Sequence, residues 1–480
     1  MTTPDPRDEQ IAELKKQLAE RDARIAQLEK LVEQLRVEIE RLRRGKRQAA
    51  PYSRDKCTAE AKRPGRKAGS GPFANRPPPS PLEVSERVAV ERPTGCPCGG
   101  SLEALGFEEV SNTDIPPAPK PRVTVYRVPI CRCRQCGRTV RGVHPDVAPD
   151  QYGATAHRLG DRVMAAAHAL HYGTGVPVRK VPAVLQELTG VAITQSAITQ
   201  DALRRAEREV GDEYQKLRDS IQEDAVVHTD DTGWRVNGKP AQLMTFASED
   251  KTVFQIRGQH RNEEVREVLP SDFKGTMVTD RGRSYDAQEL DHVRQQKCVF
   301  HVRRSIDEVL ETKVGKARWF GEKLKALLLG SLQLWHVFQE GDYLRFWIHA
   351  PWFNEEITGH LRPRTLEDPD NQRLLDELGW HHDRGNLLRF LDDPSIPPTN
   401  NLAERELRPA VIARKVSQCS KNDRGAYAHA AFASVVRTLK RQGVPSIVDA
   451  LYNTFRSARA PPPSTPAGTS PRSPRRLAMR

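Results

Sequence analysis

The chain has 480 residues, enough for two or three domains, one of which can bury a full catalytic core. Its net charge of +13 and isoelectric point of about 9.4 favour a polyanionic partner, with nucleic acid ahead of an acidic membrane surface. The polar N-terminus and the lack of any long apolar stretch argue against a signal peptide and a membrane span. Eight cysteines are too few for a disulfide scaffold.

A heptad repeat over residues 8–44 predicts a coiled coil. Its apolar positions are Ile11, Leu18, Ile25, Val32 and Ile39 at a, and Leu14, Leu28, Leu35 and Leu42 at d, with only Arg21 out of pattern. Mostly β-branched residues at a and leucines at d favour a parallel two-stranded coil. We therefore expect the chain to form a homo-oligomer through this segment.

Residues 45–85 predict a basic, disordered linker. Eleven lysines and arginines against two acids lie between Arg41 and Lys67, and glycine- and proline-rich sequence follows. Arg63, Arg66 and Lys67 are candidate contacts to DNA phosphates. A plain solubilising linker is nearly as good an interpretation. The tail 458–480, rich in proline, serine and arginine, is also predicted to be disordered.

A cysteine cluster in residues 86–148 predicts a small zinc ribbon, with an alternating stretch at 123–128 between its two halves. The proposed Zn²⁺ ligands are Cys96, Cys98, Cys133 and Cys136. The gap between Cys96 and Cys98 is one residue short of the usual spacing, and Cys131 is a spare thiol. Four thiolates would make the zinc structural; buried thiols without metal are the alternative.

Residues 153–215 predict a helical DNA-binding domain. Within it, a helix at 178–188, a turn at 190–193 and a second helix beginning after Thr194 resemble a helix-turn-helix. Helical pairs of this kind are common in α domains. The pattern therefore favours DNA recognition by this pair no more than a purely structural role.

From residue 225 the pattern changes to strands. A strand at 225–229 ends at Asp230, the Asn237–Gly238 pair predicts a hairpin, and further strands are predicted at 252–256, at 275–279 before Asp280, and at 298–302. The order βββαβαβα predicts a ribonuclease-H-like α/β domain with a mixed sheet over 222–457. Adjacent first and fourth strands would bring the two aspartates together.

Converging carboxylates at this place suit phosphodiester chemistry. Two Mg²⁺ or Mn²⁺ ions would activate an attacking oxygen and stabilise the leaving one, and such ions prefer oxygen ligands. Glu404, on the first turn of a helix that Asn400 or Asn401 caps, is the best third acid. The cations after it are candidate phosphate contacts: Arg405, Arg408, Arg414 and Lys415. Each acid alone has an ordinary structural explanation, such as a turn, a cap or a surface ion pair.

Four segments resemble the insertion-sequence 66 family of DDE transposases. Residues 228–239 match the segment of the first catalytic aspartate, 278–285 that of the second, 298–304 a cysteine–histidine–arginine segment, and 400–409 that of the glutamate. Arg281 stands where the family usually has glycine, and Thr399 where it has aspartate. The N-terminal features follow in the family's order, so the resemblance covers roughly residues 10–455.

The resemblance implies a cytoplasmic, nucleoid-associated transposase that cuts double-stranded DNA at the inverted repeats of its element and joins the ends to a target. It selects Asp230 rather than Asp231, and it suggests small accessory proteins as partners. A dimeric DNA-binding regulator without catalysis and a structure-selective nuclease on the same fold are the alternatives. Cys298 and His301 are expected to be a buried structural pair, or His301 to touch DNA. Residues 305–393 are expected to form an α-helical insertion, with helical stretches at 319–338, 343–348 and 374–391.

Overall fold

The structure is a computed structural model in which the chain forms two compact units, Met1–Ile115 and Pro116–Arg480. It describes residues 21, 24–25, 28, 79–91, 97–100, 102, 109–113, 121–144, 146–147, 158–417 and 419–457. The predicted tail lies outside these residues. So do the linker before residue 79 and the coiled coil, apart from helical residues at 21, 24, 25 and 28. Both stay predictions.

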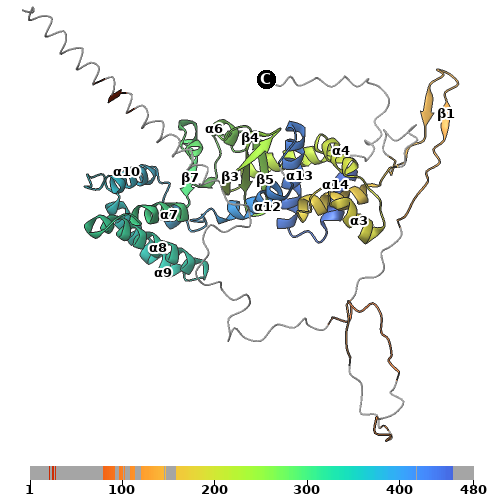
Figure 1. Cartoon of the computed structure of the whole chain (residues 1–480), viewed down its shortest axis with the longest axis horizontal. Helices are drawn as coiled ribbons and strands as arrows, with labels where there is room; N and C mark the ends of the chain where they lie inside the picture. The colour runs from red at the N-terminus through yellow and green to blue at the C-terminus, as the bar shows by residue number, and fades with distance from the viewer. Residues whose placement is uncertain are drawn as a thin grey trace, which may run out of the picture. The chain divides into compact units, whose positions relative to one another are not determined.

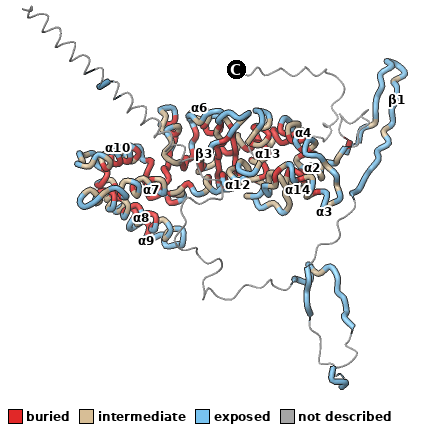
Figure 2. Tube along the Cα trace, in the orientation of Figure 1, coloured by how far each residue is buried: buried red, intermediate tan, exposed pale blue. Residues whose placement is uncertain are grey.

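A small antiparallel hairpin holds the second half of the cysteine cluster. Strand β1 (Ile130–Arg132) pairs with β2 (Thr139–Arg141), and both are exposed (Figures 1 and 2). The Cys133 amide donates to the Arg138 carbonyl at 2.8 Å, and the Gly137 amide donates to the Cys133 carbonyl at 2.9 Å. Gly137 has φ +69°, a conformation that glycine adopts without strain.

The alternating stretch expected at 123–128 is not a strand. Residues 121–129 carry no regular structure, and the pairing begins only at Ile130. Val123 and Val125, on one face, are 66% and 83% exposed, and Tyr126, on the other, is 37% exposed, so neither face of this stretch is buried. Alternation predicts a strand only where one face is buried, and here neither is.

Helices precede the main sheet. They are α2 (Asp161–His168), the π-helical η2 (Ala169–Gly173), α3 (Val181–Thr189), α4 (Gln195–Ala206), α5 (Glu209–Ser220) and the 3₁₀ turn η3 (Ile221–Glu223). They share the hydrophobic core of the sheet, except α3, which packs in a smaller cluster of its own with Ala167 and Ile198. The Thr194 hydroxyl accepts from the Ala197 amide at 3.2 Å, as expected of a cap, and Gly190 ends α3 with φ +67°. The helix expected at 178–188 begins later, at Val181. DNA reading by this helix pair stays a prediction.

The central sheet has five strands in the order β5-β4-β3-β6-β7. The strands are β3 (Val226–Val236), β4 (Lys239–Ala247), β5 (Thr252–Arg257), β6 (Thr276–Thr279) and β7 (Arg294–Lys297). β3, β4 and β5 pair antiparallel, whereas β3–β6 and β6–β7 are parallel. The adjacency of the first and fourth strands is confirmed, and the mixed α/β core is compatible with the expected ribonuclease-H-like class.

The Asn237–Gly238 turn is confirmed, with φ values of +51° and +75°. The expected end of the first strand is wrong, because β3 continues without interruption from Val226 through both aspartates to the turn. Its nine residue pairs with β4 extend the ladder as far as Val236–Lys239. Asp230 therefore lies within a strand rather than at its end.

The connection around β7 also differs from the prediction. Helix α6 (Asn262–Arg266) precedes β6, but only two 3₁₀ turns, η4 (Arg283–Tyr285) and η5 (Gln288–Leu290), separate β6 from β7. The fifth strand is Arg294–Lys297, and the stretch expected as a strand at 298–302 instead opens helix α7 (Val299–Leu310).

A helical insertion with its own core follows (Figures 1 and 2). After α7 come the 3₁₀ turn η6 (Gly315–Arg318), α8 (Trp319–Gln339), α9 (Tyr343–His360), α10 (Pro369–Asp383) and α11 (Arg389–Asp392). Its core begins at Val299, in α7 itself. The helix expected over 374–391 is interrupted at Gly385, whose φ of +68° breaks the helical conformation.

Three C-terminal helices return to the sheet: α12 (Asn401–Ser417), α13 (Asp423–Arg441) and α14 (Ile447–Ser457). Helix α13 covers the edge strand β5, where the amides of Phe254 and Thr252 donate to the hydroxyls of Ser434 and Thr438 at 2.8 and 3.0 Å. An edge strand closed in this way offers little to an incoming strand.

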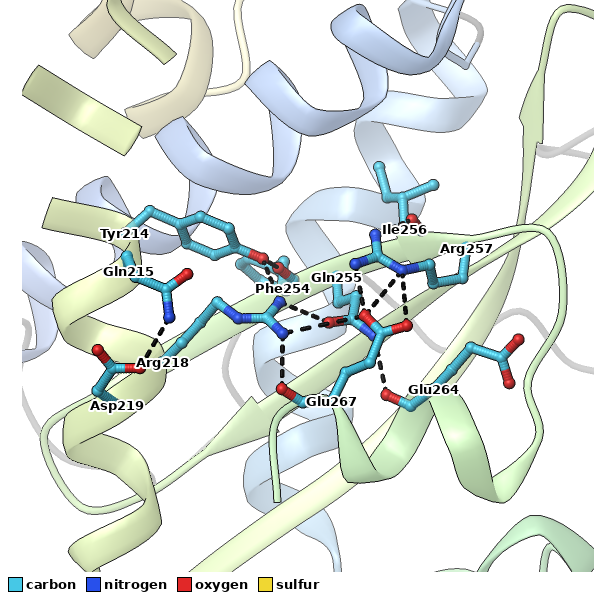
Figure 3. Close-up of polar contacts among 10 residues, drawn as sticks. All are labelled: Tyr214, Gln215, Arg218, Asp219, Phe254, Gln255, Ile256, Arg257, Glu264 and Glu267. Carbon is cyan, nitrogen blue, oxygen red and sulfur yellow. Dashed lines mark hydrogen bonds and ion pairs between the residues drawn. The ribbon is translucent and has the colours of Figure 1, made fainter. Parts of the chain in front are cut away.

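A polar network ties β5 to α5 and α6 (Figure 3). The Tyr214 hydroxyl donates to the Phe254 carbonyl at 2.6 Å, and Arg218 donates to the side chain of Gln255 at 2.5 Å and to the Glu267 carbonyl at 2.7 Å. Helix α5 thus contacts both the edge of the sheet and the segment that follows it.

Candidate active site

The two neighbouring aspartates of β3 point to opposite faces of the sheet, because successive side chains of a strand alternate. On the Asp230 face, His228 Nδ1 lies 3.3 Å from Asn400 Oδ1, just before α12. On the other face, Asp231 Oδ1 lies 2.9 Å from His260 Nδ1. The two acids therefore have different partners, a distinction that the sequence alone does not make.

Asp280 follows β6 directly and lies beside Asp230. The parallel register pairs Val226 with Thr276 and His228 with Val278, and the same offset carries Asp230 to Asp280. Asp280 Oδ1 accepts from the Gly282 amide at 2.9 Å, which bends the chain away from the end of the strand. The predicted meeting of the two aspartates is thus consistent with the observed register.

Asn400 connects the strand of Asp230 to the helix of Glu404. It is fully buried, its side-chain amide donates to the Thr229 carbonyl at 2.8 Å, and its own carbonyl accepts from the Glu404 amide at 3.2 Å. Its backbone amide donates to Cys298 Sγ at 3.2 Å. The Cys298 amide in turn donates to the Thr279 carbonyl, next to Asp280, at 2.8 Å. Asn400 and Cys298 therefore form one buried cluster. It contacts Thr229 next to Asp230, Thr279 next to Asp280, and the backbone of Glu404.

Glu404 and Glu406 have opposite environments. Glu406 is buried and ion-paired with Arg437 at 2.8 Å and Arg441 at 3.5 Å. The Glu404 side chain is 41% exposed and lies 3.9 Å from His301. It lines a pocket of about 410 Å³ together with Asp230, Asp231, Thr232, Leu407, Arg408, Val411 and Ile412. Glu404 is therefore the acid of this helix that is available to a ligand.

Burial, together with the smaller effect of the negative charges of Asp280, Asp231 and Glu404, raises the pKa of Asp230 to about 7, against the hydrogen bond from the Asp231 amide, which lowers it. Such unbalanced negative charge among hard oxygen donors suits a divalent cation. In the part of the chain that is described, however, no three aspartate, glutamate, histidine or cysteine side chains lie close enough to hold one metal ion. The raised pKa of Asp230 and the spacing of the carboxylates are compatible, because charges act over longer distances than the roughly 2.0–2.6 Å of a metal–oxygen bond. The carboxylate oxygens are suitable ligands for a divalent cation, but in this structure they are too far apart to bind one ion together.

The predicted DNA-contacting cations differ in their environment. Arg405 and Lys415 are exposed, and Arg408 lines the pocket. Arg414 donates to the Thr232 hydroxyl at 3.2 Å and to the Gly233 carbonyl, so it supports β3. The candidates of the basic linker, Arg63, Arg66 and Lys67, lie outside the described residues.

The proposed zinc ligands are described only in part. Amide donation from Cys136 and Gln135 lowers the pKa of the Cys133 thiol, as a metal-binding knuckle requires. Cys131 lies on β1, and Cys98 belongs to the other compact unit. Cys96 lies outside the described residues. The soft thiols of the hairpin fit zinc chemically, although the full ligand set is not seen together.

Three residues near the acids have roles that sequence reasoning missed. His260 gives no local signal, and Asn400, expected only as a possible cap of the helix of Glu404, instead directs its side chain to Thr229 and His228 of β3, far along the chain. Arg281, which departs from the usual glycine, donates to Glu377 at 2.7 Å and to Ser305, linking the sheet to the insertion. Cys298 and His301 do not form a pair, since Cys298 is buried and His301 is beside Glu404.

Comparison with known proteins gives two matches. The sequence model described as "Transposase IS66 family" matches residues 157–428, more than half of the chain. The model described as "zinc-finger binding domain of transposase IS66" matches residues 93–137. No curated protein matches the chain. In the described part of the chain, no helix has the length and apolar character needed to cross a membrane.

Proposed function

The chain belongs to the IS66 family of transposases, and on that premise we propose that it cuts DNA at the inverted-repeat ends of its element and joins them to a target. Asp230, Asp280 and Glu404 are the proposed catalytic acids. The observation that carries the proposal is geometric: the parallel register of β3 and β6 brings Asp280 beside Asp230, and Glu404 lines the same pocket as Asp230. Perturbed carboxylates in a cleft are typical of catalytic sites.

Two Mg²⁺ or Mn²⁺ ions, when bound, would make the attacking oxygen more acidic and stabilise the leaving oxygen. Asp230 and Asp280 would hold them from adjacent strands, and Glu404 would complete the ligand set from α12. Glu404 has room to do so, because its side chain is 41% exposed at the pocket. Asp230 must lose its proton before it ligates a cation, so metal binding and deprotonation are coupled.

The surrounding cations would bind the DNA backbone. Arg405, Arg408 and Lys415 lie on the helix of Glu404, and Arg63, Arg66 and Lys67 extend the basic surface in sequence. We further propose that Cys96, Cys98, Cys133 and Cys136 bind a structural Zn²⁺, and that residues 8–44 hold two copies together at paired DNA ends. Small accessory proteins would join this assembly.

The test is strand cleavage and joining on DNA that carries the inverted repeats flanking the gene, with Mg²⁺ or Mn²⁺. We expect wild type to cleave and join, and Asp230→Asn to do neither. Asp272→Asn, a change at an exposed turn, is the matched control and should keep both activities. Equal cleavage by wild type and Asp230→Asn would overturn the proposal. DNA binding without cleavage in all proteins would favour a regulator, and cleavage without joining would favour a nuclease.

A further inference from the structure

The β3–β4 hairpin extends beyond the rest of the sheet. Strand β6 pairs with β3 only from Val226 to His228, and β5 pairs with β4 only from Gln242 to Ala247. The ladder between β3 and β4 nevertheless continues as far as the Val236–Lys239 pair. Residues 234–241 therefore form a two-stranded arm, which begins a few residues after Asp230 in the same strand.

The segment that follows α12 holds this arm in place. The Ser420 amide donates to the Arg235 carbonyl, and the Asn237 amide donates to the Ser420 carbonyl, both at 3.1 Å. The indole of Trp234 donates to the Ser420 hydroxyl, also at 3.1 Å. The arm is therefore a fixed projection, and Lys421, the next residue of the segment, is carried beside it.

The arm carries positive charge alone. Neither aspartate nor glutamate occurs between Asp231 and Glu249 in the sequence. The side chains of Arg235, Lys239 and Lys421 are exposed, and none of them is ion-paired with another residue that the structure describes. The acid nearest to Lys421 in sequence is in the first turn of α13, where its charge favours the start of that helix. Three cations are therefore free to bind an anion.

Positive side chains continue from the pocket of the acids to the arm. Arg408 lines that pocket. Further along α12, Arg414 donates to the Thr232 hydroxyl at 3.2 Å, between the acids and the arm. Burial raises the pKa of the Cys419 thiol, whereas a backbone hydrogen bond from Arg235 and the charges of Arg414 and Arg235 lower it, so both guanidinium groups lie near this side chain.

The spacing of the arm from the acids matches duplex DNA. A β-strand advances about 3.4 Å per residue, close to the rise of about 3.4 Å between successive phosphates of one DNA strand. Arg235 follows Asp230 by five residues in β3, which corresponds to about 17 Å or about five base pairs. A two-stranded ribbon is also narrow enough to lie in the major groove.

We propose that the arm and Lys421 form a duplex-binding surface that holds DNA phosphates about five to seven base pairs from the cleavage site, an inference that rests on the function proposed above. Arg235 and Lys239 reach the phosphates from the arm, and Lys421 reaches them from the segment beside it. These contacts fix the position of the duplex relative to the acids and do not read its sequence.

The first experiment measures binding of the full chain to an inverted-repeat duplex by fluorescence anisotropy, without Mg²⁺, at several salt concentrations. Each phosphate contact that is lost lowers the slope of log affinity against log salt by about one. We expect the double variant Arg235→Gln/Lys239→Gln to lose about two from this slope, and Lys421→Gln about one. All three changes are at exposed side chains, so melting temperatures should equal that of wild type.

The matched control removes the same charge elsewhere. Lys216→Gln/Lys274→Gln changes two exposed lysines, one on α5 and one just before β6, at the end of the sheet away from the arm. Its salt dependence should equal that of wild type. Equal slopes for the two double variants would contradict the proposal, because the effect would then come from net charge and not from the arm.

The second experiment locates the contact on the DNA. A single methylphosphonate removes the charge of one phosphate. Placed about five to seven base pairs from the cut, it should weaken binding of wild type and have no further effect on Arg235→Gln/Lys239→Gln, because the two changes remove the same contact. Equal weakening of wild type and variant would show that the arm does not bind there, and would overturn the proposed position.

The arm and the function on which it rests can fail separately. If Asp230→Asn does not cleave while the arm variant binds with the wild-type salt dependence, the arm is wrong and the carboxylate site stands. If Asp230→Asn cleaves like wild type while the arm variant loses about two from the slope, the arm binds DNA and the proposed catalytic site fails.

Discussion

The side-chain amide of Asn400 donates a 2.8 Å hydrogen bond to the carbonyl of Thr229, 171 residues earlier in the chain. This bond fixes the start of α12 against β3 one residue before Asp230. The backbone carbonyl of Asn400 accepts from the Glu404 amide, so the residue whose side chain is bonded to β3 also begins the first turn of the helix that carries Glu404.

Replacing Asn400 by alanine should loosen this junction. It leaves buried partners without a hydrogen bond, which costs about 1–3 kcal/mol for each such group. We expect a lower melting temperature, slower cleavage, and a higher Mn²⁺ concentration for half-maximal activity. Asn401→Ala, an exposed neighbour at the first turn of the helix, is the control. A metal requirement that is the same in both variants would contradict the positioning role of Asn400.

The two glutamates of α12 should respond in opposite ways. Glu404→Gln should abolish cleavage with little change in melting temperature, because Glu404 is half exposed at the pocket. Glu406→Gln should destabilise the fold, because it leaves Arg437 and Arg441 with a neutral partner in a buried place. Breaking a buried ion pair typically costs about 3–5 kcal/mol. Thermal melts and cleavage rates of both variants decide the assignment.

Asp230 should make the metal-free protein less stable as pH rises. Its folded-state pKa of about 7 lies above the ordinary 3.8, so between these values the folded state holds a proton that the unfolded chain releases. The stability linked to this proton is present below pH 3.8 and is lost as pH approaches 7.

Asp230→Asn, which stays neutral, should therefore melt a few degrees above wild type at about pH 8 in a chelator, and this advantage should shrink steadily as pH falls through about 5 toward 3.8. Added Mn²⁺ should raise the melting temperature of wild type and not of the variant. A wild-type advantage at about pH 8 without metal would contradict the unbalanced charge inferred for the pocket.

Zinc should be separable from the catalytic unit. The β1–β2 hairpin is exposed and contributes nothing to the described core around the sheet. We expect Cys133→Ser to release zinc, measured with a colorimetric chelator, while the melting of the sheet is unchanged. Cys419→Ser, a cysteine far from the cluster in sequence, should keep the metal.

Local patterns predicted much of the sheet but could not predict β7. The Asn237–Gly238 turn and the apolar strands were readable, because backbone conformation and burial act over short distances. β7 reads Arg-Gln-Gln-Lys, yet three of its residues are buried. Their polar groups are satisfied by distant partners, such as Asp286 at 2.7 Å from Lys297 and the Leu387 carbonyl at 2.8 Å from Gln296. A hydrophobic pattern therefore assigns the strand to the apolar residues that follow.

The site shows the same limit. Strand alternation places Asp230 and Asp231 on opposite faces but does not say which face meets α12. That choice depends on Asn400 and His260, whose contacts with β3 come from tertiary folding. The sequence shows which side chains can bind a metal or a phosphate. It does not show which other residues contact them in the folded chain.

The covering of β5 by α13 has a consequence for biosynthesis. The amides of residues 252 and 254 find their partners only in residues 438 and 434, which leave the ribosome nearly two hundred residues later. A polypeptide that stops before α13 would present an open, apolar β-edge to other nascent chains and to proteases. Truncated translation products should therefore be removed or aggregate rather than accumulate as competent nucleases.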